Sequence, residues 1–293
     1  MPELPDVTVY VESLAARIVG QPLLHVRLRS PFLLRSVDPP LREVEGRRVT
    51  GVSRMGKRIV IALGGDLFLV IHLMIAGRLR WLPPGKKPPK RLALFALQFE
   101  HGTLVLTEAG TKRRASVHVV RTRDALRQFD RGGLDVFAAT PAQFAERLRS
   151  ENHTLKRSLT DPRLFDGIGN AYSDEILHRA RLSPLKLSTK MSEEETARLF
   201  AAMRAILSDW TQKLRAETGD GFPEKVTAFR EGMAVHGRFR QPCPDCGAPV
   251  QRIRYADNET NYCARCQTEG RLLADRALSR LLREDWPKSI DEL

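Results

Sequence analysis

The sequence predicts an α+β protein, with an N-terminal helix plus a β-sandwich domain, then a helical domain with a helix–two-turn–helix motif, and a C-terminal four-cysteine ribbon. Short strand-like runs dominate up to about residue 137, helical spacing dominates after it, and all four cysteines lie within residues 243–266. The predicted segments are a sandwich domain at 1–137, a helical domain at 138–232, a ribbon at 233–268 and a tail at 269–293.

The first segment begins with a predicted helix over residues 6–19. Val7, Val11, Leu14 and Ile18 recur at helical spacing, and Gly20 follows as a stop signal. Short apolar runs then predict seven strands, at 23–29, 48–53, 58–63, 67–73, 92–99, 103–107 and 116–120. Seven short strands after one helix favour a sandwich or a barrel.

The second half is predicted to be helical. Thr140-Pro141 is typical of an N-cap followed by proline in the first turn, and Ser192 with Glu195 forms a capping-box pattern that opens a long helix. Leu278, Leu281, Leu282 and Trp286 recur at helical spacing and predict a tail helix over 272–286. We expect its apolar face to pack on the body of the protein rather than on a partner.

Composition narrows the class of protein. The 293 residues include 48 Lys and Arg against 35 Asp and Glu, a net charge of +13, and 42% are hydrophobic, which excludes a wholly disordered chain. A strong positive charge favours a polyanionic partner such as nucleic acid, although some basic proteins bind none. No apolar run reaches 18 residues and no secretory signal is visible, so we expect a soluble intracellular protein.

The cysteines predict a metal site. Cys243 and Cys246 form one pair with a two-residue spacer, and Cys263 and Cys266 form a second. Four thiolates from two such pairs suit tetrahedral zinc with no open position, so the ion would be structural. A disulfide framework is the alternative, but the chain has no secretory signal and no further cysteine.

The N-terminus carries candidate chemistry. If Met1 is removed, Pro2 offers a secondary amine that titrates near pH 8 and is partly neutral and nucleophilic at pH 7. Attack on an aldehyde-level carbon would give an iminium, and the neighbouring Glu3 can move protons. The alternative is an ordinary solvated start of the chain.

Two further motifs stand out, and the first of them suits phosphate. Gly167–Glu175 places two glycines before a helix expected to begin near Asn170, so that free amides and the helix dipole would face an anion, and Lys156 precedes it. A capped corner between helices would carry the same residues. The turn at Gly56-Lys57 presents a lysine, which alone is a common surface feature.

Taken together, these motifs resemble those of the bacterial formamidopyrimidine-DNA glycosylase/endonuclease VIII (Fpg/Nei) family. The resemblance covers nearly the whole chain and rests on five motifs in the family's order, namely Pro2-Glu3-Leu4-Pro5, Gly56-Lys57, Ile71-His72-Leu73, Gly167–Glu175 and the four-cysteine ribbon.

The resemblance implies a bifunctional DNA glycosylase and abasic-site lyase. Pro2 would attack the sugar C1′ of a flipped-out damaged nucleotide, Glu3 would act as acid and base, and Lys57 would contact the sugar-phosphate. His72, Asn170 and Lys156 would bind DNA. The family further implies one structural Zn2+, double-stranded DNA with damaged bases or abasic sites as the partner, a monomer, no membrane, and a bacterial cytoplasm with nucleoid association.

The sequence departs from the family pattern at several DNA-contacting positions. Asn258 stands five residues before the third cysteine, where the family has an arginine, and the replacement cation is left open among Arg252, Arg254 and Arg265. Ile75 is the candidate to fill the void left by the flipped base. Glu108–Ser116 occupies the place of the usual wedge loop, with Arg113 or Arg114 as candidate intercalators.

These departures leave the lesion unspecified and two alternatives open. One is a non-catalytic protein on the same fold that binds damaged DNA or a DNA structure, which the altered wedge and finger favour. The other is an unrelated zinc-ribbon transcription or RNA-binding protein. The intact Pro2, Glu3 and Lys57 favour the enzyme.

Overall fold

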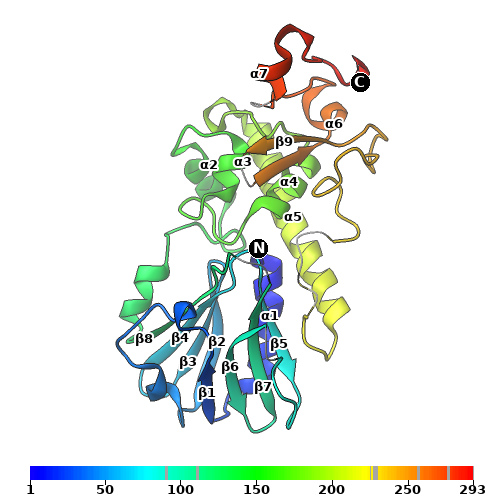
Figure 1. The fold of residues 1–293 in the computed structure, drawn as a ribbon. Helices are drawn as coiled ribbons and strands as arrows, with labels where there is room; N and C mark the ends of the chain where they lie inside the picture. The colour runs from blue at the N-terminus through cyan, green and yellow to red at the C-terminus, as the bar shows by residue number, and fades with distance from the viewer. Residues whose placement is uncertain are drawn as a thin grey trace. The chain divides into compact units, whose positions relative to one another are not determined.

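The computed structural model describes residues 1–89, 92–109, 112–224, 226, 230–255, 258–275 and 278–292 (Figure 1). The chain divides into two compact units. The N-terminal unit comprises Met1–Arg131 and Trp210–Thr227, and the C-terminal unit comprises Gly132–Asp209 and Ala228–Leu293. Among the described helices, none is both long and apolar enough to cross a membrane.

The N-terminal unit is built on two four-stranded antiparallel sheets (Figure 1). The first has the order β1-β6-β7-β5, formed by His25–Leu28, Ala93–Phe99, Gly102–Glu108 and Gly77–Leu82. The second has the order β2-β3-β4-β8, formed by Val49–Met55, Arg58–Leu63, Leu67–His72 and Ser116–Arg121. The predicted helix and β-sandwich are therefore confirmed.

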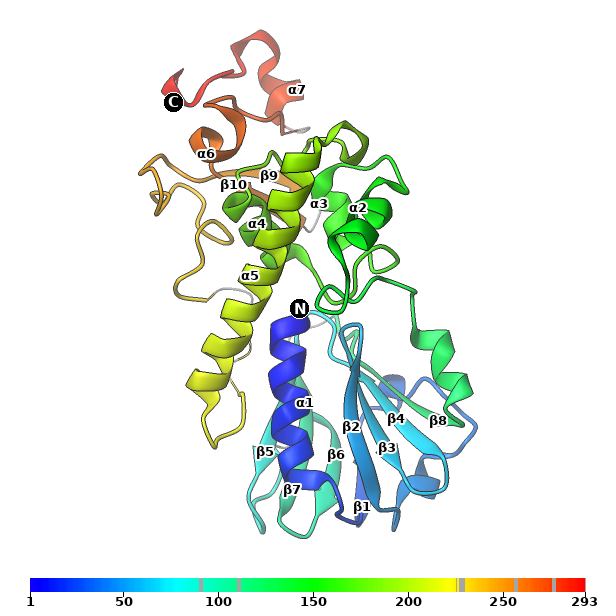
Figure 2. The same ribbon diagram turned by 180° about the vertical axis from the view of Figure 1, so that it is seen from behind.

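Helix α1, Leu4–Ile18, packs into the same core as both sheets (Figure 2). Val7, Tyr10, Leu14 and Ile18 are buried there with strand residues, as the helical spacing predicted. Burying each such side chain contributes about 1.5–3 kcal/mol, so the core rather than intrinsic helix propensity holds α1 in place. Short 3-10 turns at Pro31–Leu33, Leu41–Val44 and Asp124–Phe129 complete this unit.

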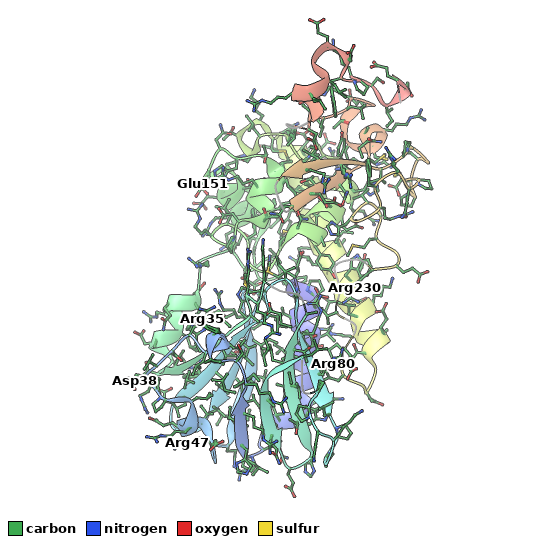
Figure 3. The ribbon with its side chains drawn as sticks, viewed as in Figure 1. Arg35, Asp38, Arg47, Arg80, Glu151 and Arg230 are labelled. Carbon is green, nitrogen blue, oxygen red and sulfur yellow. The ribbon has the colours of Figure 1, made fainter. Side chains whose placement is uncertain are left out.

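Strand β5 is absent from the sequence prediction, which placed seven strands rather than eight in this unit. Arg78 and Arg80 alternate with Leu79 and Trp81, so the segment carries the period-2 signal of a half-buried strand. Arg80 is exposed, as are Arg35 and Arg47 elsewhere on this unit, so part of the positive charge lies at the surface (Figure 3).

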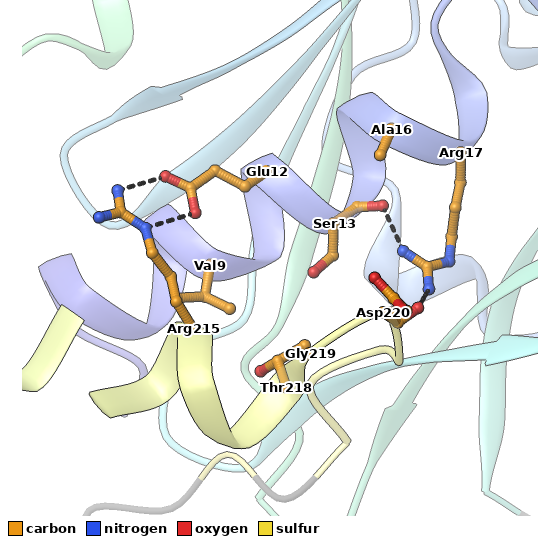
Figure 4. A pocket seen from close by; sticks show the side chains of 9 residues that line it. All are labelled: Val9, Glu12, Ser13, Ala16, Arg17, Arg215, Thr218, Gly219 and Asp220. Carbon is orange, nitrogen blue, oxygen red and sulfur yellow. Dashed lines mark hydrogen bonds and ion pairs between the residues drawn. The ribbon is translucent and has the colours of Figure 1, made fainter. Parts of the chain in front are cut away.

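The last turns of α5, Glu193–Thr218, belong to the N-terminal unit and are fastened to α1 (Figure 4). Arg215 makes a bidentate ion pair with Glu12, with Nε to Oε2 at 2.9 Å and Nη2 to Oε1 at 2.6 Å. Arg17 donates to the carbonyls of Ser13, Asp220 and Gly221. The predicted helical domain at 138–232 thus contributes its final helical turns to the first unit.

The C-terminal unit contains α2 (Pro141–Arg149), α3 (Leu155–Thr160), α4 (Asn170–Arg179), the 3-10 turn Ser188–Lys190 and the start of α5. Thr140 caps α2, and Ser192 and Glu195 form the reciprocal bonds of a capping box at the start of α5, as predicted. The ribbon hairpin follows as β9 (Gln251–Tyr255) and β10 (Asn258–Tyr262), and α6 (Ala264–Thr268) closes it.

The tail differs from its prediction. Instead of one helix over 272–286, the described residues contain α7 (Leu278–Leu282) and 3-10 turns at Arg283–Asp285 and Ile290–Glu292. Among the described tail residues, Leu272, Leu273 and Ile290 pack on the ribbon, whereas Leu281 is 77% exposed. Leu281 and Leu282 of the predicted apolar face are therefore exposed, whereas the tail packs on the body of the protein, as predicted, through described residues outside α7.

Candidate active site and DNA-binding residues

The amino end of the chain is fixed by the first turn of α1. Glu3 is the N-cap and is 3% exposed, and its side chain accepts the backbone N–H of Asp6. In return, Asp6 Oδ2 accepts the backbone N–H of Glu3 at 2.8 Å, which completes a capping box. Pro2 is buried beside this cap. The backbone that leads into Pro2 and Glu3 is therefore held by two reciprocal hydrogen bonds.

The amino group at this end lies among charged side chains. Burial lowers the pKa of the Met1 amine, Arg78 and Lys57 lower it further, and Glu3 and Asp6 oppose the shift. An amine with a lowered pKa is deprotonated in a larger fraction at neutral pH, and the deprotonated form is the nucleophile. The structure thus brings the amino end, Glu3 and Lys57 into one electrostatic neighbourhood.

Lys57 is presented by the turn between β2 and β3. Gly56 has a φ of +60°, a left-handed conformation that favours glycine, and Arg54 Nη1 donates to the Gly56 carbonyl at 2.9 Å. Lys57 is half-buried. The tight turn therefore holds the lysine by its backbone rather than leaving it on a long loop.

His72 ends β4, opposite Arg58 of β3 and Ser116 of β8. Burial lowers the pKa of His72 to about 4, and the positive charges of Arg58 and Lys57 and the nearby His118 add to the shift. The imidazole is consequently neutral at pH 7, and it can offer a phosphate a hydrogen bond but no full charge.

Ile75 lies at the tip of the turn between β4 and β5 and is 59% exposed. Met74 before it has a φ of +52°, and a Cβ on Gly77 would lie 2.2 Å from the Leu73 carbonyl oxygen, so only glycine fits there. Arg78 braces the turn by donating to the carbonyls of Ile75 and Gly77. An apolar side chain is therefore held out into solvent by a rigid turn, as a void-filling residue requires.

The loop between β7 and β8 is organised by Glu108. This carboxylate is 2% exposed and accepts the backbone N–H groups of Arg114, at 2.8 Å, and Ala115, at 3.2 Å. Arg113 and Arg114 are exposed on the same loop, and residues 110 and 111 of the predicted wedge segment lie outside the described residues. Glu108 is thus a positioning residue for the candidate intercalators.

In the C-terminal unit, Asn170 is the first residue of α4 and follows the N-cap Gly169, as predicted. Its Nδ2 donates to the carbonyl of Glu259 in the ribbon hairpin at 2.9 Å. Lys156 donates to the Asn170 carbonyl at 2.7 Å and to Asp174 Oδ1 at 2.6 Å, and its side chain is 12% exposed. The charge of Lys156 is therefore already balanced inside this unit, and direct contact with phosphate stays a prediction.

Buried carboxylates of α4 hold the segment that leads into the ribbon. Glu175 accepts the backbone N–H groups of Ala234, Val235 and His236 at 2.7 to 2.9 Å. Asp174 Oδ2 lies 2.7 Å from His236 Nδ1. Both carboxylates are almost fully buried, and together they fix the ribbon against α4.

The four cysteines form one cluster, in which the Sγ atoms all lie within 4.8 Å of one another. The Sγ atoms of Cys243 and Cys266 are 3.8 Å apart and those of Cys246 and Cys263 are 3.4 Å apart, which is too far for disulfides. Zinc–sulfur bonds of about 2.3 Å in a tetrahedron place sulfurs roughly 3.8 Å apart. The donor set and its spacing therefore fit one structural zinc whose coordination is complete.

The three arginines of the ribbon that could replace the family's arginine have different surroundings. The Arg252 guanidinium carbon lies 4.1 Å from the centroid of the Phe239 ring, and its Nη1 lies 3.7 Å from Glu259 Oε2. Arg265 pairs with Asp291 of the tail. Arg254 is exposed, and among the described residues its guanidinium has no ion pair or ring contact. Asn258 is also exposed, at the start of β10.

Sequence reasoning missed the residues that support the site, including Asp174, Glu175, His178, Arg78 and Glu108. Acidic residues inside the Gly167–Glu175 motif were the available signal for the first two, because a carboxylate on the inner side of a helix requires partners. The partners of Arg78 and Glu108 are backbone groups, which carry no sequence signal.

Three family models match the chain. The Formamidopyrimidine-DNA glycosylase N-terminal domain covers residues 1–117, the Formamidopyrimidine-DNA glycosylase H2TH domain covers 135–216, and the zinc finger found in FPG and IleRS covers 240–268. The tail after residue 268 lies beyond all three.

Curated relatives and solved structures agree with these matches. Formamidopyrimidine-DNA glycosylase of Thermus thermophilus is 36% identical over 92% of this chain and 100% of its own, and that of Heliobacterium modesticaldum is 32% identical over 91% and 100%. The structure of Lactococcus lactis Fpg with abasic-site DNA is 25% identical, with a TM-score of 0.80 over 91% of this chain and 99% of that chain. The chain therefore belongs to the formamidopyrimidine-DNA glycosylase family.

Proposed function

We propose that this protein removes damaged bases from double-stranded DNA and cleaves the strand at the resulting abasic site, with Pro2 as the nucleophile. The observation that carries the proposal is that Pro2 and Glu3 are buried at the first turn of α1, where Arg78 and Lys57 are near enough to add to the lowering of the pKa of the Met1 amine by burial. Removal of Met1 would place the secondary amine of Pro2 at this end.

The chemistry follows from these groups. The neutral Pro2 nitrogen forms a bond to C1′, the glycosidic bond breaks, and the base leaves with the bonding electrons. The nitrogen gives its proton to the Glu3 carboxylate, and Glu3 passes that proton to the ring oxygen as the oxygen's bond to C1′ breaks, so that an iminium results. The departed base takes its proton from water. The iminium acidifies C2′–H, so the 3′ phosphate and then the 5′ phosphate leave by β- and δ-elimination. Lys57 holds the phosphate and stabilises the developing charge.

The remaining site residues would bind the DNA. His72, Asn170 and Lys156 are proposed phosphate ligands or supports, Ile75 would fill the void left by the flipped base, and Arg113 or Arg114 would intercalate. Solved complexes of the Lactococcus lactis relative contain abasic-site, Fapy-dG and oxidised-pyrimidine DNA, and we infer the same substrate class here. The curated relatives come from bacteria, so we place the protein in a bacterial cytoplasm, with DNA.

The decisive experiment is borohydride trapping on oligonucleotides with a single abasic site or a single lesion. Wild type verified to begin at Pro2 should form a covalent adduct, Pro2→Gly should form less, and an N-terminal tag that blocks the amine should abolish it. Pro84→Gly, in the exposed turn after β5, is the matched control and should trap as wild type does. Glu3→Gln should impair base removal more than cleavage at a ready-made abasic site.

The same experiment addresses the alternative of a non-catalytic DNA-binding protein. Tight binding of abasic DNA by verified wild type, without any trapped adduct, would contradict the enzyme and support the binding protein. The exposed Asn258 in place of the family's finger arginine is the observation that keeps this alternative open.

A further inference from the structure

One face of α4 makes polar contacts with the ribbon and with the segment that leads into it. Asn170, Asp174, Glu175 and His178 are spaced by four, one and three residues, which places them along one side of the helix. Asn170 contacts the Glu259 carbonyl, Asp174 contacts His236, and Glu175 accepts backbone N–H groups of residues 234–236. The fourth, His178, reaches the cysteine cluster itself.

His178 Nε2 lies 3.3 Å from Cys243 Sγ, and the two residues are 4% and 2% exposed. A zinc-bound cysteine is a thiolate and carries no proton. The short contact is therefore favourable only if the imidazole carries hydrogen on Nε2 and donates it to the sulfur.

We propose that His178 supports the zinc centre without binding the metal. Its Nε2–H donates a hydrogen bond to the Cys243 thiolate, which orients this sulfur and withdraws charge from it. His178 is not needed as a direct ligand, because four sulfurs already fill the coordination that structural zinc adopts. It acts as a positioning residue, through Cys243.

The contact also joins two parts of the C-terminal unit that are 65 residues apart in sequence. Asp245 lies near the same imidazole, since one ligand atom each from His178, Asp245 and Cys266 fall within 4.8 Å of one another. The helix that begins with Asn170 is thus tied directly to the zinc ligands, independently of the catalytic proposal.

The test uses the full chain loaded with Co2+, whose sulfur-to-metal charge-transfer band reports the electron density on the thiolates. His178→Leu removes the donor, so the band should move to lower energy and cobalt affinity should fall about tenfold. His178→Gln can place an N–H near the same position and should restore both. His101→Leu, an exposed histidine of the N-terminal unit, is the matched control and should change neither.

A measurement on wild type avoids any dependence on how the variants fold. In the zinc-loaded protein, 15N spectra of labelled histidine should show the His178 proton on Nε2. A bare Nε2, or a His178→Leu variant that folds and keeps the wild-type band and cobalt affinity, would overturn the proposal. Because neither readout involves DNA, failure here would leave the glycosylase proposal untouched.

Discussion

The surroundings of His72 change the pKa of its imidazole. Its pKa falls from 6.5 to about 4, mainly because the folded state buries it and also because Arg58 and Lys57 are near. The unfolded chain takes up a proton as the pH falls below 6.5, whereas the folded protein resists until about pH 4. Stability attributable to this residue is therefore present above pH 6.5 and is lost between 6.5 and 4.

His72→Gln should remove this pH dependence. Between pH 7 and 4.5, wild type should lose roughly 2 to 3 kcal/mol more of its free energy of unfolding than the variant does. Urea unfolding at the two pH values measures the difference. His118, whose pKa is also lowered by burial and then by Arg58 and Arg35, leaves a residual slope in both proteins. Equal losses in the two proteins would mean that His72 is not held neutral.

We propose Arg254 as the arginine that supplies the charge that Asn258 lacks, because it is exposed and, among the described residues, its guanidinium has no ion pair or ring contact. Arg254→Gln should lower the slope of log affinity for DNA against log salt by about one, because one phosphate contact is lost. Arg265→Gln is the matched control, since Arg265 already pairs with Asp291, and it should leave the slope unchanged. A changed slope in the control alone would assign the finger cation to Arg265 instead.

At the scale of the element, the side chains of α4 hold the ribbon and the segment that leads into it in place. Glu175→Ala would leave three backbone N–H groups without their acceptor in a buried place, and we expect a loss of about 3 kcal/mol or more. Glu146→Ala, on the exposed side of α2, should stay within about 0.5 kcal/mol. Chemical denaturation of both variants checks this, and similar stabilities would show that the contacts are dispensable.

Elements with a strong local signal could be predicted from the sequence. The apolar spacing of α1, the Thr140 cap and the Ser192–Glu195 capping box each depend on nearby residues, and the structure has them where expected. The tail helix failed, because Leu278, Leu281 and Leu282 suggested an apolar face, while packing depends on where Leu272 and Ile290 meet the ribbon. These are tertiary contacts, and no local sequence pattern predicts them.

The residues of the candidate site also fall into those that the sequence could predict and those that it could not. Pro2, Glu3, Lys57 and the cysteines could be named because their chemistry is intrinsic to the residue type and spacing. The contact between His178 and Cys243 could not, since it joins residues far apart in sequence, and nothing near His178 indicates a sulfur partner.

At the scale of the whole molecule, zinc should stabilise one unit and leave the other intact. The ribbon core is small, with Val235, Ala248 and Val250 packed beside the cysteines, whereas the N-terminal unit has its own extensive core. The protein should contain one zinc per chain, and chelation should abolish DNA binding while hydrogen exchange in β2–β8 stays slow. Far less than one zinc per chain, with DNA binding intact, would contradict this.

The fastening of α5 to α1 has a consequence for the order in which the protein is made. Arg215, which pairs with Glu12, and Phe222, which packs on the core, both belong to the N-terminal unit, so the contacts of this unit are incomplete when residue 131 leaves the ribosome. Another 96 residues, from 132 to 227, must first be synthesised, which takes about 5 to 20 s. During that time residues 210–227 cannot cover the surface of α1. A chain truncated at residue 131 would leave this surface exposed permanently.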